Sequence, residues 1–303
     1  MLDEKIKVFL ADRRRIWGAV AVTLAVIVLL CVAMCRHDSP ETEVLPEDAQ
    51  VTDTLALNII CTPTLESLPL YHAIESGLCD SLNLALVIRT EESQFDVDSI
   101  IRRTKRIDGA VLDTYRLEHY RKTKCPLKVT EEIPLIGKWS LVTAGPLRIR
   151  ETSKLKKRTV AFARFSTSYN CFERSLVGTG LKASSLYHAQ INDYSLRLHM
   201  LDEAQIEASV LPEPYATRAC LNGHRVVWTA DSVSSLVLCM RSKAMQVDRK
   251  RSQLKQLKQV YNLAVKDLNA HGVHAADSAL IKNYGLSAAA IDTLCLPRYT
   301  IVK

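Results

Sequence analysis

The stretch LPLYHAIESGLCDSLNLALVIRT, residues 68–90, decides the fold. Its first part, residues 68–75, has the apolar spacing of an amphipathic helix, and residues 84–88 form a short apolar run that is typical of a buried strand. A similar apolar run precedes the helix, at residues 55–60. A strand, a helix and a strand in this order predict parallel strands that helices cover on both faces.

The same alternation continues along most of the chain. We expect further helices at residues 98–105, 114–122, 168–177, 194–202 and 214–221, and further strands at residues 109–112, 127–133, 159–162, 186–191, 208–211 and 226–229. The length fits two sheets better than one, and the predicted fold class is α/β. Two apolar runs, at residues 139–143 and 236–240, stand apart from the alternation and are expected to pass between two lobes.

The C-terminal part of the chain is predicted to be helical. Residues 245–271 have the pattern of one long helix with an apolar face, and residues 277–284 and 287–294 that of two short helices. Many Lys and Arg side chains surround the long helix. Because the charged outer face of an amphipathic helix is usually solvated, we interpret this side as surface and not as a nucleic-acid patch.

The composition is that of a chain that folds. Its 303 residues include 40 Lys and Arg, 33 Asp and Glu, 48% apolar residues, and only 10 Gly and 10 Pro. These values exclude a disordered, collagen-like or disulfide-scaffold chain. The net charge of +7 leaves +5 for the 268 residues that follow residue 35. This excess is spread thinly and lacks a groove-reading motif, so the sequence predicts no nucleic-acid partner.

Residues 16–35 (IWGAVAVTLAVIVLLCVAMC) have the length and polarity of a transmembrane helix. Three arginines directly before this segment place residues 1–15 in the cytoplasm and the rest of the chain outside. Residues 36–54 are acidic, contain two prolines and are predicted to be a tether. A cleaved signal peptide, a lipoprotein signal with Cys31 or Cys35, and a buried soluble helix are the alternatives for residues 16–35.

Nine cysteines divide between two regions. Cys31 and Cys35 lie in the predicted span, and seven cysteines follow it. The chain has no C-x-x-C pair and no Cys/His spacing suited to zinc, so we predict no metal site, no redox motif and no cofactor. The seven cysteines are interpreted as small buried residues, with one or two disulfides left open.

Four segments together resemble the periplasmic solute-binding proteins of ABC importers. They are residues 68–90, the DGAVLD turn at 108–113, KLKKRTVAFARFSTSYN at 154–170 and MLDEAQIEASVLPEPYATRA at 200–219. The branch that they resemble handles nitrate, alkanesulfonates, taurine and thiamine-precursor pyrimidines. The resemblance implies the type II periplasmic-binding-protein fold, with two Rossmann-like lobes joined by crossing strands. Residues 55–144 and 235–303 would form lobe 1, and residues 145–234 would form lobe 2.

This chain departs from the pattern of that branch at two places. Lys157 stands where the branch often carries glycine before a strand of the second lobe, and the loop CTPTLESLPL at 61–70 contains no glycine. These departures leave the predicted fold unchanged. They do put the ligand contacts of the branch in doubt for this chain.

The predicted ligand-binding residues lie where strands end and helices begin. Backbone N–H groups at a helix start favour anions, so Ser166, Thr167, Ser168 and Tyr169 are candidates, with plain helix capping as the alternative. Thr62 and Thr64 belong to the matching loop of the other lobe, where a simple strand-to-helix turn is the alternative. Asp113 and Asn192 also follow strands, and Asp113 is equally suited to cap the helix that follows it.

Glu213 and Tyr215 form the strongest pair of candidates. Glu213 stands between two prolines and is suited to accept hydrogen bonds from an amine or amidine, while Tyr215 can stack on a flat ligand. A helix start with a favourably placed Glu and a packed Tyr is the alternative. Trp139 is a candidate for the cleft lining or for a filler of the hinge.

The sequence therefore predicts a non-catalytic, membrane-tethered protein that delivers a small anionic or flat heterocyclic molecule to an ABC permease and its ATPase. We expect a monomer in a bacterial cytoplasmic membrane, with its folded part in the periplasm or outside. A ligand-sensing ectodomain that acts through a membrane partner is one alternative. An enzyme similar to the pyrimidine synthase related to this branch is another, although the chain lacks the cysteine-rich run of that enzyme and known hydrolase or nucleotide motifs.

Overall fold

The computed structural model describes residues 55–123 and 127–302. The predicted span at 16–35 and the tether at 36–54 lie outside the described residues. Within the described part, no helix is long and apolar enough to cross a membrane.

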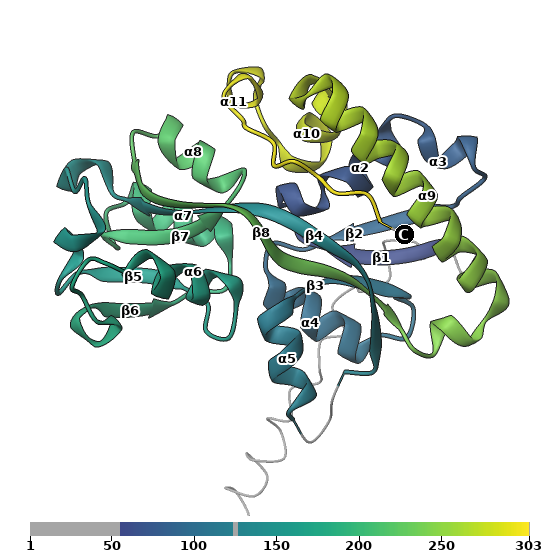
Figure 1. Cartoon of the computed structure of the whole chain (residues 1–303), viewed down its shortest axis with the longest axis horizontal. Coiled ribbons are helices and arrows are strands. Elements are labelled where there is room, and N and C mark those ends of the chain that lie inside the picture. Colours follow the sequence, from purple (N-terminus) through teal and green to yellow (C-terminus); the bar gives the residue numbers. More distant parts are fainter. Residues whose placement is uncertain (1–54, 124–126, 303) are drawn as a thin grey trace, which may run out of the picture. The chain divides into compact units, whose positions relative to one another are not determined.

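Within these ranges, eight strands form one hydrogen-bonded sheet in the order β2-β1-β3-β8-β4-β7-β5-β6 (Figure 1). The pairs β1–β2, β1–β3, β5–β6 and β5–β7 are parallel, and β4 and β8 run antiparallel to their neighbours. The strands are β1 (Leu57–Cys61), β2 (Leu86–Thr90), β3 (Gly109–Asp113), β4 (Val129–Thr143), β5 (Thr159–Phe162), β6 (Tyr187–Gln190), β7 (Ala208–Pro212) and β8 (Arg225–Arg241).

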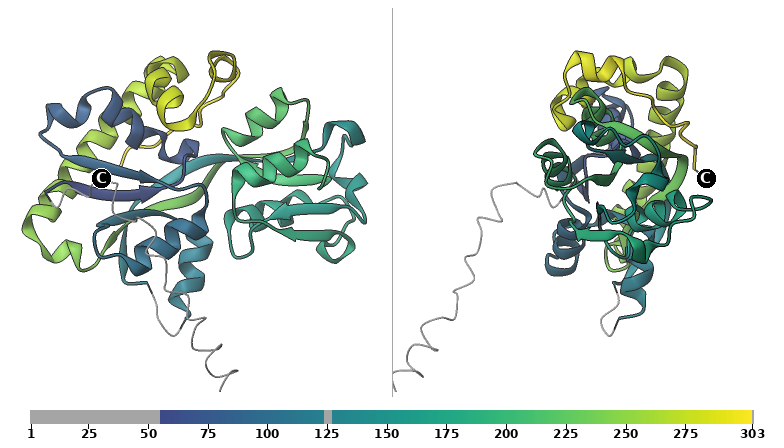
Figure 2. Two further views of the ribbon diagram at one scale, coloured as in Figure 1. Left: turned by 180° about the vertical axis from the view of Figure 1, so that it is seen from behind. Right: turned by 90° about the vertical axis from the view of Figure 1, so that its left-hand side faces the viewer.

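The two crossing strands are longer than predicted and join both halves of the sheet. β4 and β8 pair from Val129 with Arg241 to Thr143 with Arg225, so that one sheet replaces the two that the length favoured. Four predicted runs, at 127–133, 139–143, 226–229 and 236–240, are parts of these two strands. Register shifts occur before, within and after the segment from Pro134 to Gly137 and accommodate these two residues, which usually interrupt strands. Figures 1 and 2 show these two strands running between the lobes.

The first lobe contains β1–β3, one half of each crossing strand, and helices on both faces of this part of the sheet. Residues of β1 alternate between two cores, since Leu57, Ile59 and Cys61 pack with helices α2, α9 and α10, whereas Ile60 packs with α4 and α5. A strand that is buried on both faces has a continuous apolar run in its sequence. This explains why the sequence predicts β1 and β3.

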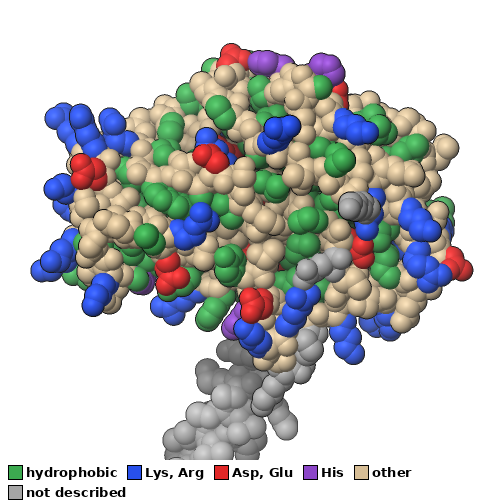
Figure 3. All heavy atoms as spheres, in the orientation of Figure 1, with side chains coloured by type: hydrophobic (Ala, Val, Ile, Leu, Met, Phe, Trp, Pro, Cys, Tyr) green, Lys and Arg blue, Asp and Glu red, His purple; other side chains and the backbone are tan. Residues whose placement is uncertain are grey.

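The second lobe contains β5–β7 and the other half of each crossing strand. Its core combines Val160, Phe162 and Val210 with residues of α6, α7 and α8. The Phe162 ring stacks on that of Phe172, with centroids 4.7 Å apart. Lys and Arg side chains are spread over both lobes on the face that Figure 3 shows.

The helices begin and end close to the predicted positions, with two exceptions. Helix α4 begins four residues earlier than expected because the Ser93 hydroxyl accepts a hydrogen bond from Asp96 N, and the short helix α3 was not predicted. The helices are α2 (Leu68–Glu75), α3 (Leu78–Ser81), α4 (Gln94–Arg103), α5 (Thr114–Arg121), α6 (Thr167–Ser175), α7 (Tyr194–Asp202), α8 (Tyr215–Leu221), α9 (Asp248–His271), α10 (Asp277–Tyr284) and α11 (Ala288–Asp292).

Candidate functional site

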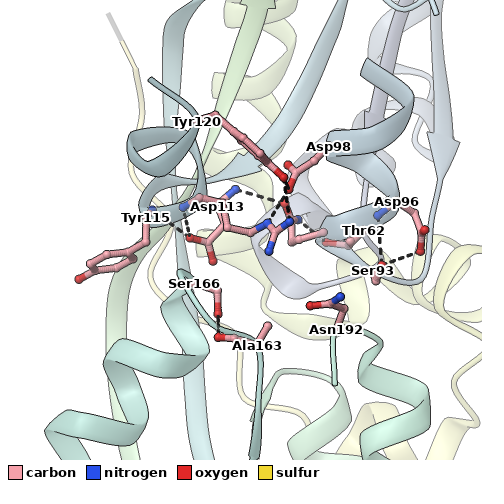
Figure 4. Close-up of polar contacts among 12 residues, drawn as sticks. Thr62, Ser93, Asp96, Asp98, Asp113, Tyr115, Tyr120, Ala163, Ser166 and Asn192 are labelled. Carbon is pink, nitrogen blue, oxygen red and sulfur yellow. Dashed lines mark hydrogen bonds and ion pairs between the residues drawn. The ribbon is translucent and has the colours of Figure 1, made fainter. Parts of the chain in front are cut away.

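The candidate site lies where the carboxyl ends of the parallel strands of one lobe face those of the other. Several hydrogen bonds join the lobes directly. At the strand ends, Leu65 N donates to Glu213 O at 3.0 Å and Thr167 N donates to Asp113 Oδ2 at 2.8 Å, and farther out Ser195 Oγ donates to Glu92 Oε2 at 2.9 Å. Figure 4 shows Asp113 on the first lobe opposite Ser166 on the second. Ligands of open α/β folds bind in crevices at such strand ends.

Asp113 is the predicted site residue with the most contacts to both lobes. Its Oδ1 accepts hydrogen bonds from Tyr115 N at 2.9 Å and Arg116 N at 3.3 Å, which caps α5, and its Oδ2 accepts from Thr167 N at the start of α6. The side chain is buried, and this burial raises its pKa to about 6. One carboxylate therefore occupies the starts of two helices from different lobes, as the helix dipole favours.

The two serine hydroxyl groups at the start of α6 form hydrogen bonds within the second lobe. Ser166 Oγ donates to Ala163 O at 2.7 Å, and Ser168 Oγ accepts from Ala163 N at 3.0 Å. Ser166 is the N-cap residue but makes no side-chain capping bond. Thr167 Oγ1 donates to Ser235 O on β8 at 3.2 Å. The Asp113 carboxylate thus takes the place at this helix start that the sequence assigns to serine hydroxyls or a ligand.

Glu66, in the loop after β1, carries a buried carboxyl group that contacts both crossing strands, and the sequence analysis did not select it. Its Oε1 accepts hydrogen bonds from Trp139 Nε1 on β4 at 2.9 Å and from Ser235 Oγ on β8 at 3.0 Å. Its Oε2 is buried and has no hydrogen-bond partner among the described residues. Burial raises the pKa of Glu66. Trp139 is 1% exposed and fills the hinge between the lobes.

Thr62 and Thr64 lie in the loop after β1, as predicted, but are buried in the closed cleft. Gln94 Nε2 donates to Thr62 Oγ1 at 3.0 Å, and Gln94 Oε1 accepts from Asp113 N at 3.2 Å. Thr64 Oγ1 is buried, and its hydroxyl group interacts with the Glu66 carboxylate and opposes the rise in the pKa of Glu66. Gln94 therefore connects the Thr62 loop to Asp113.

Glu213 and Tyr215 are buried on the second lobe. Glu213 Oε2 accepts a hydrogen bond from Thr217 N at 3.0 Å, which fits the helix-start alternative, and burial raises its pKa. Tyr215 OH donates to Glu92 Oε2 on the first lobe at 3.4 Å, and its ring packs on Tyr194 with centroids 5.5 Å apart. Both residues thus contribute to the contact between the lobes.

A pocket of about 280 Å³, which we call the cleft mouth, opens between the lobes beside Asp113. The His119 ring of the first lobe stacks on the Phe165 ring of the second, with centroids 4.2 Å apart and planes 11° apart. Phe165 is 58% exposed and has a φ of 53°, a strained conformation of the kind that clusters at binding sites. The lining residues are Phe95, Arg116, His119, Tyr120, Arg164, Phe165, Gln190 and Asn192.

Of the residues predicted from the sequence, Asn192 lines the cleft mouth and Tyr169 lies away from the cleft. Tyr169 packs against Phe162 and donates its hydroxyl hydrogen to Glu173 within the second lobe. Arg116 in the cleft mouth pairs with Asp98 at 2.5 Å, so its charge is compensated. The sequence analysis missed His119, which lies on helix α5 and lines the pocket only because the second lobe approaches it.

The described part of the chain offers no cluster of three or more His, Cys, Asp or Glu residues that could hold a metal ion. No disulfide joins any two of six described cysteines: Cys61, Cys79, Cys171, Cys220, Cys239 and Cys295. The disulfides that the sequence analysis left open are therefore not formed among these six.

No protein-family model matches the chain, and no curated protein sequence matches it. Solved structures are similar in fold. A ligand-binding component of an ABC-type import system from Staphylococcus aureus, with zinc bound, is 14% identical, with a TM-score of 0.67 over 78% of this chain and 81% of the other. The aliphatic sulphonate-binding protein SsuA from Escherichia coli is 16% identical, with a TM-score of 0.60 over 78% and 77% of the two chains.

The alkanesulfonate-binding protein SsuA from Xanthomonas axonopodis pv. citri, bound to MOPS, gives 14% identity and a TM-score of 0.64 over 78% of this chain and 82% of the other. The three structures are described as ligand-binding proteins, and two belong to the sulfonate branch that the sequence segments resemble. The predicted fold of periplasmic solute-binding proteins is therefore confirmed.

Proposed function

We propose that this protein is a membrane-tethered, extracytoplasmic solute-binding protein that delivers a small molecule to an ABC-type permease. The observation that carries the proposal is the cleft mouth, which residues of both lobes line beside the strand ends. The apolar segment at 16–35 would hold the folded part at the outer face of a bacterial cytoplasmic membrane. Such a tether raises the local concentration of a binding protein near its permease.

Hinge closure supplies the mechanism of this proposal. Only β4 and β8 run from lobe to lobe within the described residues, so a rotation about these strands would separate Asp113 from Thr167 and Leu65 from Glu213. A solute that touches both lobes stabilises the closed form by its differential affinity. The permease and its ATPase would then recognise a monomer of this protein in the closed form.

The walls of the cleft favour a flat solute. The Phe165 and His119 rings, one from each lobe, form one wall of the cleft mouth. Aromatic side chains supply large contact areas to planar ligands. Of the two ligand classes predicted from the sequence, a flat heterocycle therefore fits better than a small inorganic anion.

A thermal-shift screen of the full chain against pyrimidines, sulfonates, nitrate and amino acids tests the proposal. A solute at 100 times its Kd stabilises a protein by about 2.7 kcal/mol, which corresponds to a rise in Tm of roughly 5–10 °C for a chain of this size. We expect one class to produce such a rise. If none of the four classes changes Tm, the transport function is wrong.

Phe165→Ala and Tyr187→Ala form a matched pair for this screen. Both remove an exposed aromatic side chain of the second lobe, but only Phe165 lines the cleft mouth. We expect Phe165→Ala to weaken solute binding about tenfold, since stacking is worth on the order of 1 kcal/mol, and Tyr187→Ala to leave binding unchanged. Equal effects of the two variants would place the site elsewhere.

A further inference from the structure

The start of α6 is a place where an anion would be expected to bind, and the protein already holds an anion there. Thr167 N donates to Asp113 Oδ2 at 2.8 Å, while the other oxygen of the same carboxylate caps α5. Asp113 is 1% exposed. An anionic solute at this helix start would therefore meet a buried carboxylate of like charge, which disfavours its binding.

The charges around Asp113 explain why the carboxylate is tolerated. Arg197 on α7 is fully buried and interacts electrostatically with Asp113, while its Nε and Nη1 donate to Ile191 O and Val210 O at 2.8 Å each. Arg116 on α5 also lowers the energy of the ionised carboxylate. The helix start and Arg197 together form a positive environment, and Asp113 is the group that neutralises it.

Glu66 adds an independent observation about the ligand. Its Oε2 is a buried acceptor without a hydrogen-bond partner among the described residues, although its Oε1 has two donors. Leaving a buried acceptor unsatisfied costs free energy, so this oxygen is suited to a donor that a solute brings. A positive charge or an N–H group meets this need, and an anion does not.

Glu66 and Asp113 belong to one connected site. Ser235 on β8 joins them, because its hydroxyl donates to Glu66 Oε1 at 3.0 Å and its carbonyl accepts from Thr167 Oγ1 at 3.2 Å. Trp139 on β4 contacts Glu66 and lies edge-on to Tyr194 of the second lobe. Two carboxyl groups and two aromatic rings are thus buried close together where the lobes meet. Arg164, in contrast, lies at the exposed rim.

We propose that the cleft selects a neutral or cationic planar solute with N–H donors: Asp113 excludes anions from the start of α6, and Glu66 accepts a hydrogen bond from the solute. This inference rests on the proposed solute-binding function and names the class of its ligand. The Asp113 carboxylate then determines that this protein does not bind anions at the start of α6.

Calorimetric titration of the full chain with two probes tests the inference. Sodium sulfate probes the start of α6, and we expect Asp113→Ala to bind it at least tenfold more tightly than the unchanged protein does. Asp113→Asn preserves the shape of the side chain and should also bind sulfate more tightly than the unchanged protein does. Asp202→Ala is the matched control, because the Asp202 carboxylate accepts hydrogen bonds from Asn222 and His224 of its own lobe. Circular dichroism verifies that each variant is folded.

Benzamidine, a flat ring with an amidinium group, probes Glu66. We expect the unchanged protein to bind it and Glu66→Gln to bind it at least tenfold more weakly, since the amide would present an N–H in place of the free oxygen. Asp202→Ala should bind it normally. Equal sulfate affinity with and without Asp113, absent benzamidine binding, or equal benzamidine binding with and without the Glu66 carboxylate would overturn the inference.

The two proposals fail in different ways. If no solute of the wider screen stabilises the protein but Asp113→Ala still gains sulfate binding and Glu66→Gln loses benzamidine, the transport function fails and the charge preference of the cleft stands. If a sulfonate or nitrate raises Tm of the unchanged protein and binds it as tightly as the Asp113→Ala variant, the solute-binding function stands and the charge preference is wrong.

Discussion

At the scale of single residues, the buried carboxyl group of Asp113 makes stability depend on pH. Its pKa rises from 3.8 to about 6 in the folded protein, chiefly because of burial. Between these two values the folded chain holds a proton that the unfolded chain has lost. The contribution of Asp113 to the free energy of unfolding is therefore largest below pH 4 and is lost as the pH rises through about 6.

The groups that interact with Asp113 keep one charge state through this window. They lie on α5, α6 and α7: Arg116, Tyr115, Cys171, Tyr194 and Arg197. We expect Asp113→Asn to flatten the decrease in unfolding free energy between pH 4 and pH 7, measured by urea titration at each pH. The same slope with and without the carboxyl group would show that Asp113 is not buried as described.

Single residues also mark the limit of what the sequence could predict about the site. Asp113 was selected because it follows a strand, Thr167 because it begins a helix, and Trp139 because it lies beside a predicted crossing strand. In the structure Thr167 N donates to Asp113, and Trp139 donates to Glu66 at the hinge. Glu66 stands in the same quoted loop as Thr62 and Thr64, yet an acidic residue near a helix start is common and drew no attention. Its importance depends on Trp139 and Ser235, which lie 73 and 169 residues away.

At the scale of elements, the periodic helices and the doubly buried strands could be predicted. The crossing strands could be predicted only in part, at residues 139–143 and 236–240, and not over their full length. α2, α7 and α10 have the predicted bounds because their apolar spacing and first turns are local properties. β4 contains Pro134 and Gly137, which signal a break in a sequence. The bulges that accommodate them exist only because β8 pairs alongside, which is a contact between distant segments.

The crossing strand β4 needs glycine at position 137, because a Cβ there would overlap the Glu66 carboxylate. We expect Gly137→Ala to lower the free energy of unfolding by about 1–3 kcal/mol, the usual cost of overpacking. Denaturant titration measures this loss. In the double variant with Glu66→Ala, the overlap disappears, so the two losses should fall short of additivity by at least about 0.5 kcal/mol. Additive losses would mean that Gly137 and Glu66 do not meet.

At the scale of the whole folded part, the central claim is that two lobes close on a small solute. The predicted type II fold rests on a few quoted segments, and the similar solved structures confirm it at 14–16% identity. The order of the strands and the closed contact between the lobes could not be predicted, since they depend on pairs such as Leu65 with Glu213 that no local pattern encodes.

Amide hydrogen exchange, measured with and without the solute that raises Tm most, tests this claim most directly. Leu65 N and Thr167 N donate to the opposite lobe, whereas Asp108 N donates to Asn58 O within the first lobe and is the control. We predict that the solute slows exchange at Leu65 and Thr167 at least tenfold and leaves Asp108 nearly unchanged. Equal slowing at all three amides, or none at Leu65 and Thr167, would contradict closure of the lobes on the solute.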